Sequence, residues 1–209
     1  MERSSASTKA VGGILAWRRR ILLATAGVAV LLVLRFWIVC PYRIPSRSME
    51  PTLHGHVEGT ESGGDTVLVC KAAYLFSPPR RWDVVALDVH NIDRAGVARS
   101  VSMVKRVVGL PGERIEILAG SVVVDGQPAE VPSSLLGLRY LDRGPHGNRE
   151  VVLGPGDYFV LGDHSYLSRD SRDWGPVAID RIFGKVLAVV SPLERATWLS
   201  AESVSDETR

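Results

Sequence analysis

A serine-rich segment bounded by prolines is the first candidate for a nucleophile. Residues 45–53 read PSRSMEPTL, so Ser46 and Ser48 lie between Pro45 and Pro51. Proline fixes its own φ and restricts the residue before it, which holds the backbone around these hydroxyls stiffly. A fixed position favours nucleophilic attack, because a small misplacement of the attacking atom costs rate. A Pro/Ser linker between two parts of the chain is the alternative interpretation of this segment taken alone.

A lysine in an apolar strand is the candidate general base. Residues 101–109 read VSMVKRVVG, and strand alternation puts Lys105 on one face with Val101, Met103 and Val107, and Arg106 on the other. Burial lowers the pKa of an amine, and a neutral lysine can accept the proton of a serine hydroxyl. The alternative is an edge-strand lysine that points into water.

A polar loop after a predicted strand is the third candidate segment. Residues 159–175 read FVLGDHSYLSRDSRDWG, which is unusually dense in hydroxyls, carboxylates and arginines. Paired charges can hold such a loop rigid, and one hydroxyl can orient a lysine. A solvated loop is the alternative.

The patterns of several other catalytic and cofactor-binding classes are missing from the sequence. It contains no GxxxxGK[ST], GxGxxG, HExxH or GxSxG pattern. His54 and His56 lie in a glycine-rich stretch, where a solvated loop is favoured over a metal site. Cys40 and Cys70 are too few for a disulfide framework or a four-thiolate site, and whether they pair is left open. We therefore expect no metal and no organic cofactor.

An apolar run near the N-terminus predicts a transmembrane helix over residues 21–40. Apart from Thr25, Gly27 and Arg35 the run is apolar, and about 20 residues make roughly 30 Å of helix, enough to cross a bilayer. The stem of Arg35 can carry its charge to the headgroups. A cleaved signal peptide is the main alternative, but residues 40–45 (CPYRIP) contain no small-x-small cleavage site, which favours an uncleaved anchor.

Charge predicts the orientation of this anchor. Residues 1–20 contain five basic side chains and one acidic side chain, whereas the whole chain of 209 residues carries a net charge of only +2. The positive-inside rule then keeps the N-terminus cytoplasmic and sends residues 41–209 across the membrane. The near-neutral remainder argues against a nucleic-acid-binding face. The predicted layout is a basic cytoplasmic N-terminus (1–20), the anchor (21–40), an extracytoplasmic catalytic domain (41–195) and a polar tail (196–209).

The part of the chain after the anchor is predicted to be mainly β, as a folded sheet or barrel-like domain. Short runs rich in β-branched residues, separated by glycine, proline and aspartate, indicate strands. These runs are Thr66–Cys70, Asp83–Val89, Val101–Val108, Arg114–Leu118, Ser121–Val124, Tyr158–Leu161 and Ile182–Val190. Ala119-Gly120 predicts a hairpin between two of them. The polar stretches 54–64 and 130–149 are predicted to be surface loops.

Taken together and in this order, these segments resemble the type I signal peptidases, the membrane-bound serine–lysine proteases that remove signal peptides from exported proteins. The chain is most similar to the short, single-anchor Gram-positive-like members. The matching motifs are residues 46–53 (SRSMEPTL), 64–69 (GDTVLV), 105–113 (KRVVGLPGE) and 162–172 (GDHSYLSRDSR), and the resemblance spans roughly residues 14–190.

The resemblance implies a role for each matching residue. Ser48 is implied as the nucleophile and Lys105 as the general base, with Ser168 hydrogen-bonded to the lysine. The Ser48 amide and the Ser46 hydroxyl are implied to form the oxyanion hole. Scaffolding charges around the site are implied at Asp163, Arg106, Asp170 and Arg172. The implied partners are signal peptides of exported preproteins and the lipid bilayer of the cell membrane, with no cofactor and no nucleic acid.

The chain also departs from the family pattern. His164 stands where asparagine is common, Trp82 where glycine is common, and residues 165–167 (SYL) where polar and charged residues are usual. These departures bear on loop geometry and substrate preference. Two other functions remain open: a Ser–His hydrolase that uses Ser48 with His54 or His164, and a catalytically inactive anchored β-domain that serves as an interaction module.

Overall fold

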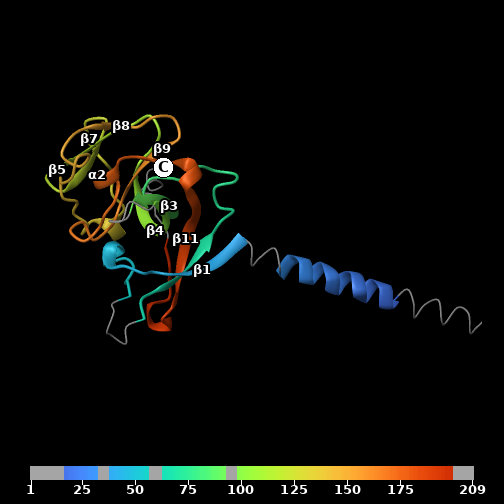
Figure 1. The fold of residues 1–209 in the computed structure, drawn as a ribbon. Helices are drawn as coiled ribbons and strands as arrows, with labels where there is room; N and C mark the ends of the chain where they lie inside the picture. Colours follow the sequence, from blue (N-terminus) through green and yellow to red (C-terminus); the bar gives the residue numbers. More distant parts are fainter. Residues whose placement is uncertain (1–16, 33–37, 57–62, 93–97, 200–209) are drawn as a thin grey trace, which may run out of the picture. The chain divides into compact units, whose positions relative to one another are not determined.

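The computed structural model describes residues 17–32, 38–56, 63–92 and 98–199 (Figure 1). The chain divides into two compact units, Met1–Val39 and Cys40–Arg209. The second unit is built mainly from β-strands, which confirms the predicted class of this domain.

The first unit contains a helix over residues 17–32, and its leucines are exposed, for example Leu22 (72%) and Leu31 (66%). The predicted span 21–40 also includes residues 33–37, which lie outside the described residues. Among the described residues, no helix combines the length and the apolar character needed to cross a bilayer. The predicted helix is wrong at its end, because Val39 and Cys40 already belong to strand β1 (Val39–Arg43). Pro41 explains this end, since the residue before a proline disfavours helical geometry.

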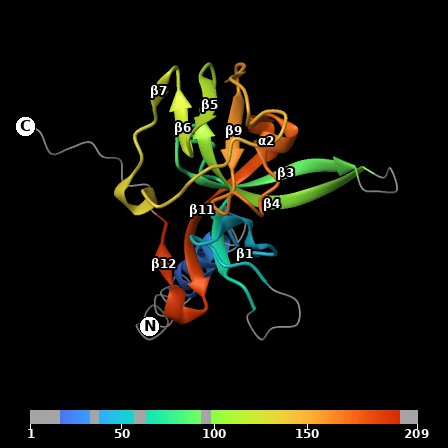
Figure 2. The ribbon, with the colours of Figure 1, turned by 90° about the vertical axis from the view of Figure 1, so that its left-hand side faces the viewer.

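The main sheet carries both candidate catalytic segments. In the described part of the chain it has eight strands, in the order β1-β2-β11-β3-β4-β9-β10, with β12 paired to β11. Beyond β1 these are β2 (Thr66–Cys70), β3 (Val84–Ile92), β4 (Ala98–Gly109), β9 (Asp157–Leu161), β10 (Val177–Ala178), β11 (Ile182–Ser191) and β12 (Thr197–Trp198). Figure 2 shows β3 and β4 side by side as a long two-stranded ribbon.

A smaller sheet, in the order β7-β6-β5-β8 among the described residues, follows β4. Its strands are β5 (Arg114–Leu118), β6 (Ser121–Val124), β7 (Gln127–Pro128) and β8 (Val151–Val152). The predicted hairpin between β5 and β6 is confirmed. Ala119 and Gly120 both have positive φ, the geometry that a two-residue hairpin turn needs.

Short helices connect the strands. They are the 3₁₀ helices η1 (Arg47–Met49), η2 (Ser133–Leu135), η3 (Ile179–Arg181) and η4 (Leu193–Arg195), and the α-helix α2 (Ser171–Trp174). The strands that the sequence did not predict are β1, β7, β8, β10 and β12, each of two to five residues. β7, β8, β10 and β12 have two residues each, too few for a period of two to be visible, and β1 overlaps the apolar run that was assigned to the anchor.

Apolar side chains cover both faces of the main sheet. Along β3, Val84 and Ala86 pack into one cluster, whereas Val85 and Leu87 pack into another. Lys105 lies opposite Val85, and Met103 and Val107 belong to the same cluster as Val85, so the predicted face of Lys105 is confirmed. A further cluster joins the smaller sheet to β9, with Ile115 and Phe159 at its centre.

The two cysteines are free and lie on opposite faces of the sheet. Cys40, on the neighbouring strand β1, packs against the cluster that contains Val67 and Val69 of β2. Because successive side chains alternate along β2, Cys70 points to the other face from Val69. This arrangement keeps the two thiols apart across the sheet, and both are free.

The stretch 130–149 is not the simple surface loop that its polarity predicted. Leu135 and Tyr140 are buried in the cluster under the smaller sheet. The prediction was wrong because a few apolar side chains, spaced irregularly, anchor an otherwise polar segment. Of the other predicted loop, 54–64, residues 57–62 lie outside the described residues.

Trp82 occupies a backbone position that normally favours glycine. Its φ is +71°, in the left-handed region, which explains why glycine is common here in the family that the sequence resembles. The indole is nevertheless buried, with 6% exposure, and its Nε1–H donates to the carbonyl of Glu130 at 2.8 Å. Trp82 thus joins the start of β3 to the segment between β7 and β8.

We expect Trp82→Gly to destabilise the protein by about 1–4 kcal/mol. Removing a buried indole costs about 3–5 kcal/mol, and relief of the left-handed strain returns about 1–2 kcal/mol. Denaturant titration followed by circular dichroism would measure the difference, with Trp82→Phe as the variant that keeps most of the burial. A Trp82→Gly protein as stable as the wild type would contradict this account.

Candidate active site

Ser48 lies in a rigid turn rather than in a linker. It occupies the middle of η1 and is buried, as is its neighbour Met49, which packs into the core. Gly55 is needed for this turn, since a Cβ there would lie 2.1 Å from the backbone carbon of Ser46. The segment between the two prolines is therefore part of the folded domain.

The structure brings Ser48 and Lys105 together although they are 57 positions apart. The Nζ of Lys105 donates to the Oγ of Ser48 at 2.8 Å and to the carbonyl of Val104 at 3.0 Å. The only other hydrogen-bond partner of the Ser48 hydroxyl among the described residues is the Oγ of Ser46, at 3.1 Å. The ring Nδ1 of His164 instead accepts the amide proton of Leu167. Lysine, and not histidine, therefore contacts the hydroxyl.

Burial controls the protonation of Lys105. Its side chain lies in the sheet with only 3% exposure. Desolvation lowers its pKa from 10.5 to about 8, while the nearby carboxylates of Asp170 and Asp163 partly oppose this effect. A substantial fraction of neutral amine is thus present near pH 8, directly beside a serine hydroxyl.

Ser46 lies on the solvent side of this pair. It is exposed, in contrast to Ser48 and Lys105. Its backbone is extended and its hydroxyl reaches the Ser48 Oγ. A substrate can approach Ser48 from this side, where the Ser46 hydroxyl is available as a donor.

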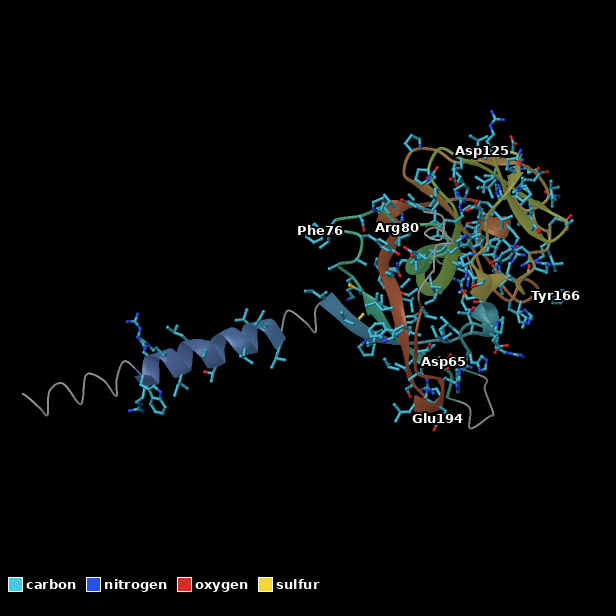
Figure 3. All side chains as sticks on the ribbon, turned by 180° about the vertical axis from the view of Figure 1, so that it is seen from behind. Asp65, Phe76, Arg80, Asp125, Tyr166 and Glu194 are labelled. Atoms are coloured by element: carbon cyan, nitrogen blue, oxygen red, sulfur yellow. The ribbon has the colours of Figure 1, made fainter. Side chains whose placement is uncertain are left out.

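The loop after β9 packs directly against Ser48. The amide of His164 donates to the carbonyl of Ser48 at 3.0 Å. Gly162 permits this approach, because a Cβ there would lie 2.5 Å from the Ser48 carbonyl and 2.2 Å from the Ser168 hydroxyl. The neighbouring Tyr166, one of the departures from the family pattern, points away from the domain and is 78% exposed (Figure 3).

Ser168 lies in this loop but does not hydrogen-bond to Lys105 in this structure. It is fully buried, and its hydroxyl has no hydrogen-bond partner in the described part of the chain. A buried hydroxyl without a partner is unusual in a folded protein. The hydrogen bond implied for this residue by sequence resemblance is therefore absent, although the residue is next to the site.

The residues implied as scaffolding charges form buried ion pairs. Arg106 binds Asp163 through both carboxylate oxygens, at 2.8 and 2.6 Å. Arg172 binds Asp170 in the same bidentate way, at 2.8 and 2.6 Å, and both side chains are fully buried. Bidentate geometry and further hydrogen bonds offset the desolvation cost of such pairs.

These ion pairs tie three segments of the site to each other. Arg106 is on β4 next to Lys105, and Asp163 is in the loop that contacts Ser48. Thr52, four residues after Ser48, donates its hydroxyl to the Asp163 carboxylate. The sequence analysis assigned no role to Thr52. Its position beside Pro51, inside the motif at residues 46–53, could have indicated a place in the site. Asp170 also caps α2 and accepts the amide proton of Gly162.

No group of three or more His, Cys, Asp or Glu side chains within the described ranges is placed to hold a metal ion. His54, which was considered for such a site, donates its backbone amide to Asp65 at 2.8 Å.

We expect the buried amine to make stability depend on pH. Below pH 8 Lys105 is charged in both states, and burying the charge costs free energy. Between about 8 and 10.5 only the unfolded state keeps the proton, so stability rises with pH. Relative to a Lys105→Met variant, the wild type should gain about 3 kcal/mol of unfolding free energy between pH 7 and 10.5. Denaturation at several pH values would measure this.

Lys71→Met, which changes an exposed lysine, is the matched control. Its unfolding free energy should differ from that of the wild type by the same amount at every pH. A constant difference for Lys105→Met as well would show that the amine is not desolvated.

Comparison with known proteins shows the family of this chain. The chain matches the family model described as "Signal peptidase, peptidase S26" over residues 16–191. It is 33% identical over 175 residues to "Signal peptidase I" of Leptolyngbya laminosa, covering 82% of this chain and 79% of that protein. It is 32% identical over 180 residues to "Probable signal peptidase I-1" of Synechocystis sp., covering 85% of this chain and 84% of that protein.

A solved structure of a signal peptidase I from Enterococcus faecalis is 24% identical, covers 52% of this chain and 97% of that chain, and gives a TM-score of 0.40. The match to the family model extends from the helix of the first unit to the end of β11 and includes every candidate catalytic residue. The chain therefore belongs to the S26 family of signal peptidases.

Proposed function

We propose that this protein is a membrane-anchored serine endopeptidase that cleaves signal peptides from exported preproteins, with Ser48 as nucleophile and Lys105 as general base. The observation that carries the proposal is the 2.8 Å contact between the buried Nζ of Lys105 and the Oγ of Ser48. The relatives named signal peptidase I support the choice of substrate.

In the first step, neutral Lys105 accepts the Ser48 proton while Oγ attacks the scissile carbonyl. The Ser48 amide and the Ser46 hydroxyl donate to the developing oxyanion, and each such donor is typically worth about 3 kcal/mol. The hydroxyl of Ser46 already lies 3.1 Å from the attacking oxygen, which supports this role.

In the second step, the C–N bond of the tetrahedral intermediate breaks as the protonated Lys105 gives its proton to the leaving amine, which leaves an ester on Ser48 and a neutral Lys105. It then activates a water that hydrolyses the ester and restores Ser48. Because the pKa of Lys105 is about 8, the amine is mostly protonated at lower pH, and the rate should fall there. These steps need no metal and no organic cofactor.

Ser168 is proposed to orient Lys105 during these proton transfers. Its buried hydroxyl has no partner among the described residues, so it can turn toward the amine without breaking another hydrogen bond. The ion pairs Arg106–Asp163 and Arg172–Asp170 are proposed as the scaffold that holds this loop against Ser48.

The substrate is proposed to bind as an added β-strand beside the exposed edge of the site. In that mode its side chains alternate, so shallow apolar pockets can select small residues at the first and third positions before the cleaved bond.

We also propose the layout of the chain in the cell. Residues 1–20 are a basic cytoplasmic segment, a single transmembrane anchor lies within residues 21–40 and ends before strand β1, residues 41–195 are the extracytoplasmic catalytic domain, and residues 196–209 are a polar tail. The apolar run of residues 21–40 and the exposed leucines of the helix over residues 17–32 support the anchor, because lipid would cover side chains that are costly to expose to water. An anchor places the enzyme in the same bilayer as a membrane-inserted substrate, which raises their effective concentration.

We expect Ser48→Ala, Lys105→Ala and Lys105→Arg each to lower preprotein cleavage at least about 10³-fold, because the nucleophile and its base act as one unit. An arginine keeps its proton and cannot serve as the base. The measurement is gel-based cleavage of one preprotein by the detergent-solubilised full chain, with Lys71→Ala as the control at an exposed lysine.

Normal turnover by Lys105→Ala would exclude the serine–lysine mechanism. Loss of turnover only on removal of His54 or His164 would indicate the Ser–His alternative. A wild type that neither cleaves preproteins nor reacts with a serine-directed inhibitor would indicate an inactive interaction domain.

We expect the full chain to stay with the membrane pellet after alkaline carbonate extraction, because a spanning helix is not displaced as a surface-bound protein is. A variant that lacks residues 1–40 should move to the soluble fraction or bind only weakly. Extraction of the full chain by carbonate would contradict the anchor.

A further inference from the structure

The loop after β9 that carries Ser168, here called the catalytic loop, is bound by a segment that contains none of the family motifs. In residues 140–146, the amide of Leu141 donates to the Ser165 hydroxyl at 2.7 Å, and the amide of His146 donates to the carbonyl of Arg172 at 3.0 Å. In return, the Arg172 guanidinium donates to the carbonyl of Leu141 at 3.2 Å. We call residues 140–146 the strap. It binds the catalytic loop at both ends of the stretch that contains Ser168.

Arg143 is the side chain of the strap that reaches Ser168. Its guanidinium donates to the carbonyl of Ser168, to the carbonyl of Ser165 at 3.4 Å and to the carboxylate of Asp173 at 3.1 Å. Asp173 in turn accepts the amide proton of Asp170 in the capping box of α2. Arg143 therefore joins the turn that carries Ser168 to the helix that follows it.

The position of the Ser168 side chain depends on its backbone. Its hydroxyl makes no hydrogen bond within the described residues, so no side-chain contact of that kind holds it in place. Its amide donates to the carbonyl of His164, and its carbonyl accepts from Arg143. Of these two backbone contacts, the one to Arg143 comes from outside the loop.

We infer that Arg143 is a positioning residue for the reaction: it holds the Ser168 backbone in the place from which the hydroxyl, which has no partner among the described residues, can turn toward Lys105. This inference rests on the proposed serine–lysine function. Within the described part of the chain, Arg143 makes no hydrogen bond to Ser48 or Lys105, so its effect on the reaction is proposed to pass through Ser168.

The same contacts predict a larger effect on rate than on stability. The Arg143 side chain is 33% exposed and its carboxylate partner is 23% exposed. Ion pairs this close to solvent contribute at most about 1 kcal/mol to stability. Displacement of a catalytic group by about 1 Å, in contrast, can lower the rate about 100-fold.

The test compares Arg143→Met with Arg139→Met in the full chain. Both substitutions keep an apolar stem and remove a guanidinium from neighbouring positions of the chain. Within the described ranges, however, Arg139 donates only to the carbonyls of Leu136 and Leu138 in its own segment. We expect Arg143→Met to lower kcat about 10- to 100-fold with KM nearly unchanged and a Tm within a few degrees of the wild type. Arg139→Met should match the wild type in all three.

The pH profile and a conservative variant separate positioning from a general loss of structure. The charged groups near Lys105 are Asp163, Asp170 and Arg172. A loosened Ser168 admits water to the amine, so the acid limb of the kcat profile should move to higher pH in Arg143→Met. Arg143→Lys keeps the charge but cannot reach three acceptors at once, so we expect it to restore only part of kcat.

Several outcomes would overturn the inference. One is an unchanged kcat and pH profile in Arg143→Met, and another is a fall in kcat that is explained by the loss of folded protein. A third is full recovery of kcat in Arg143→Lys, which would show that charge alone matters. These results are distinct from failure of the proposed function, in which the wild type itself would not cleave the preprotein.

Discussion

The exclusion of water from one amine is the physical condition on which this domain depends. Lys105 can act as a base near neutral pH only if its charged form is made costly, and burial in the sheet supplies that cost. The same burial gives the amine few hydrogen-bond partners, and one of them is the Ser48 hydroxyl. Desolvation and alignment of the catalytic pair are therefore consequences of one arrangement, in which a turn and a loop close over a central strand.

Two adjacent residues of strand β4, Lys105 and Arg106, have different roles. Because side chains alternate along β4, Lys105 faces the nucleophile while Arg106 points to the other side and binds Asp163. Asp163 also accepts from Thr52, just after the nucleophile turn. The Arg106–Asp163 pair thus joins β4 to the loop that contacts Ser48. Among the described residues no carboxylate bonds directly to the amine of Lys105, where it would favour the protonated form.

Local patterns in the sequence predicted much of this structure. The β-branched runs became strands because a period of two is a local property, and Ala119-Gly120 formed its turn because those two residues set the required φ values. The rigidity of the proline-bounded segment and the sheet face on which Lys105 lies were also predicted from local properties, namely the restricted φ of proline and the alternation of side chains along a strand. The stretch 130–149 was misjudged because its importance lies in contacts made by Tyr140 and Arg143 with residues 20 or more positions away. Polarity alone does not reveal such contacts.

By itself, the sequence determined which functional groups the site contains. They are a serine in a rigid turn, a lysine on an apolar strand face, and a loop of hydroxyls and paired charges, in the order typical of one protease family. The tertiary structure decided what chemistry these groups can carry out. A distance of 2.8 Å between atoms 57 positions apart, the low pKa of Lys105 and the hold of Arg143 on Ser168 all arise from packing between remote segments. Residue types set which proton transfers are possible, but solvent exclusion depends on every segment that covers the site, and that coverage is a property of the folded chain.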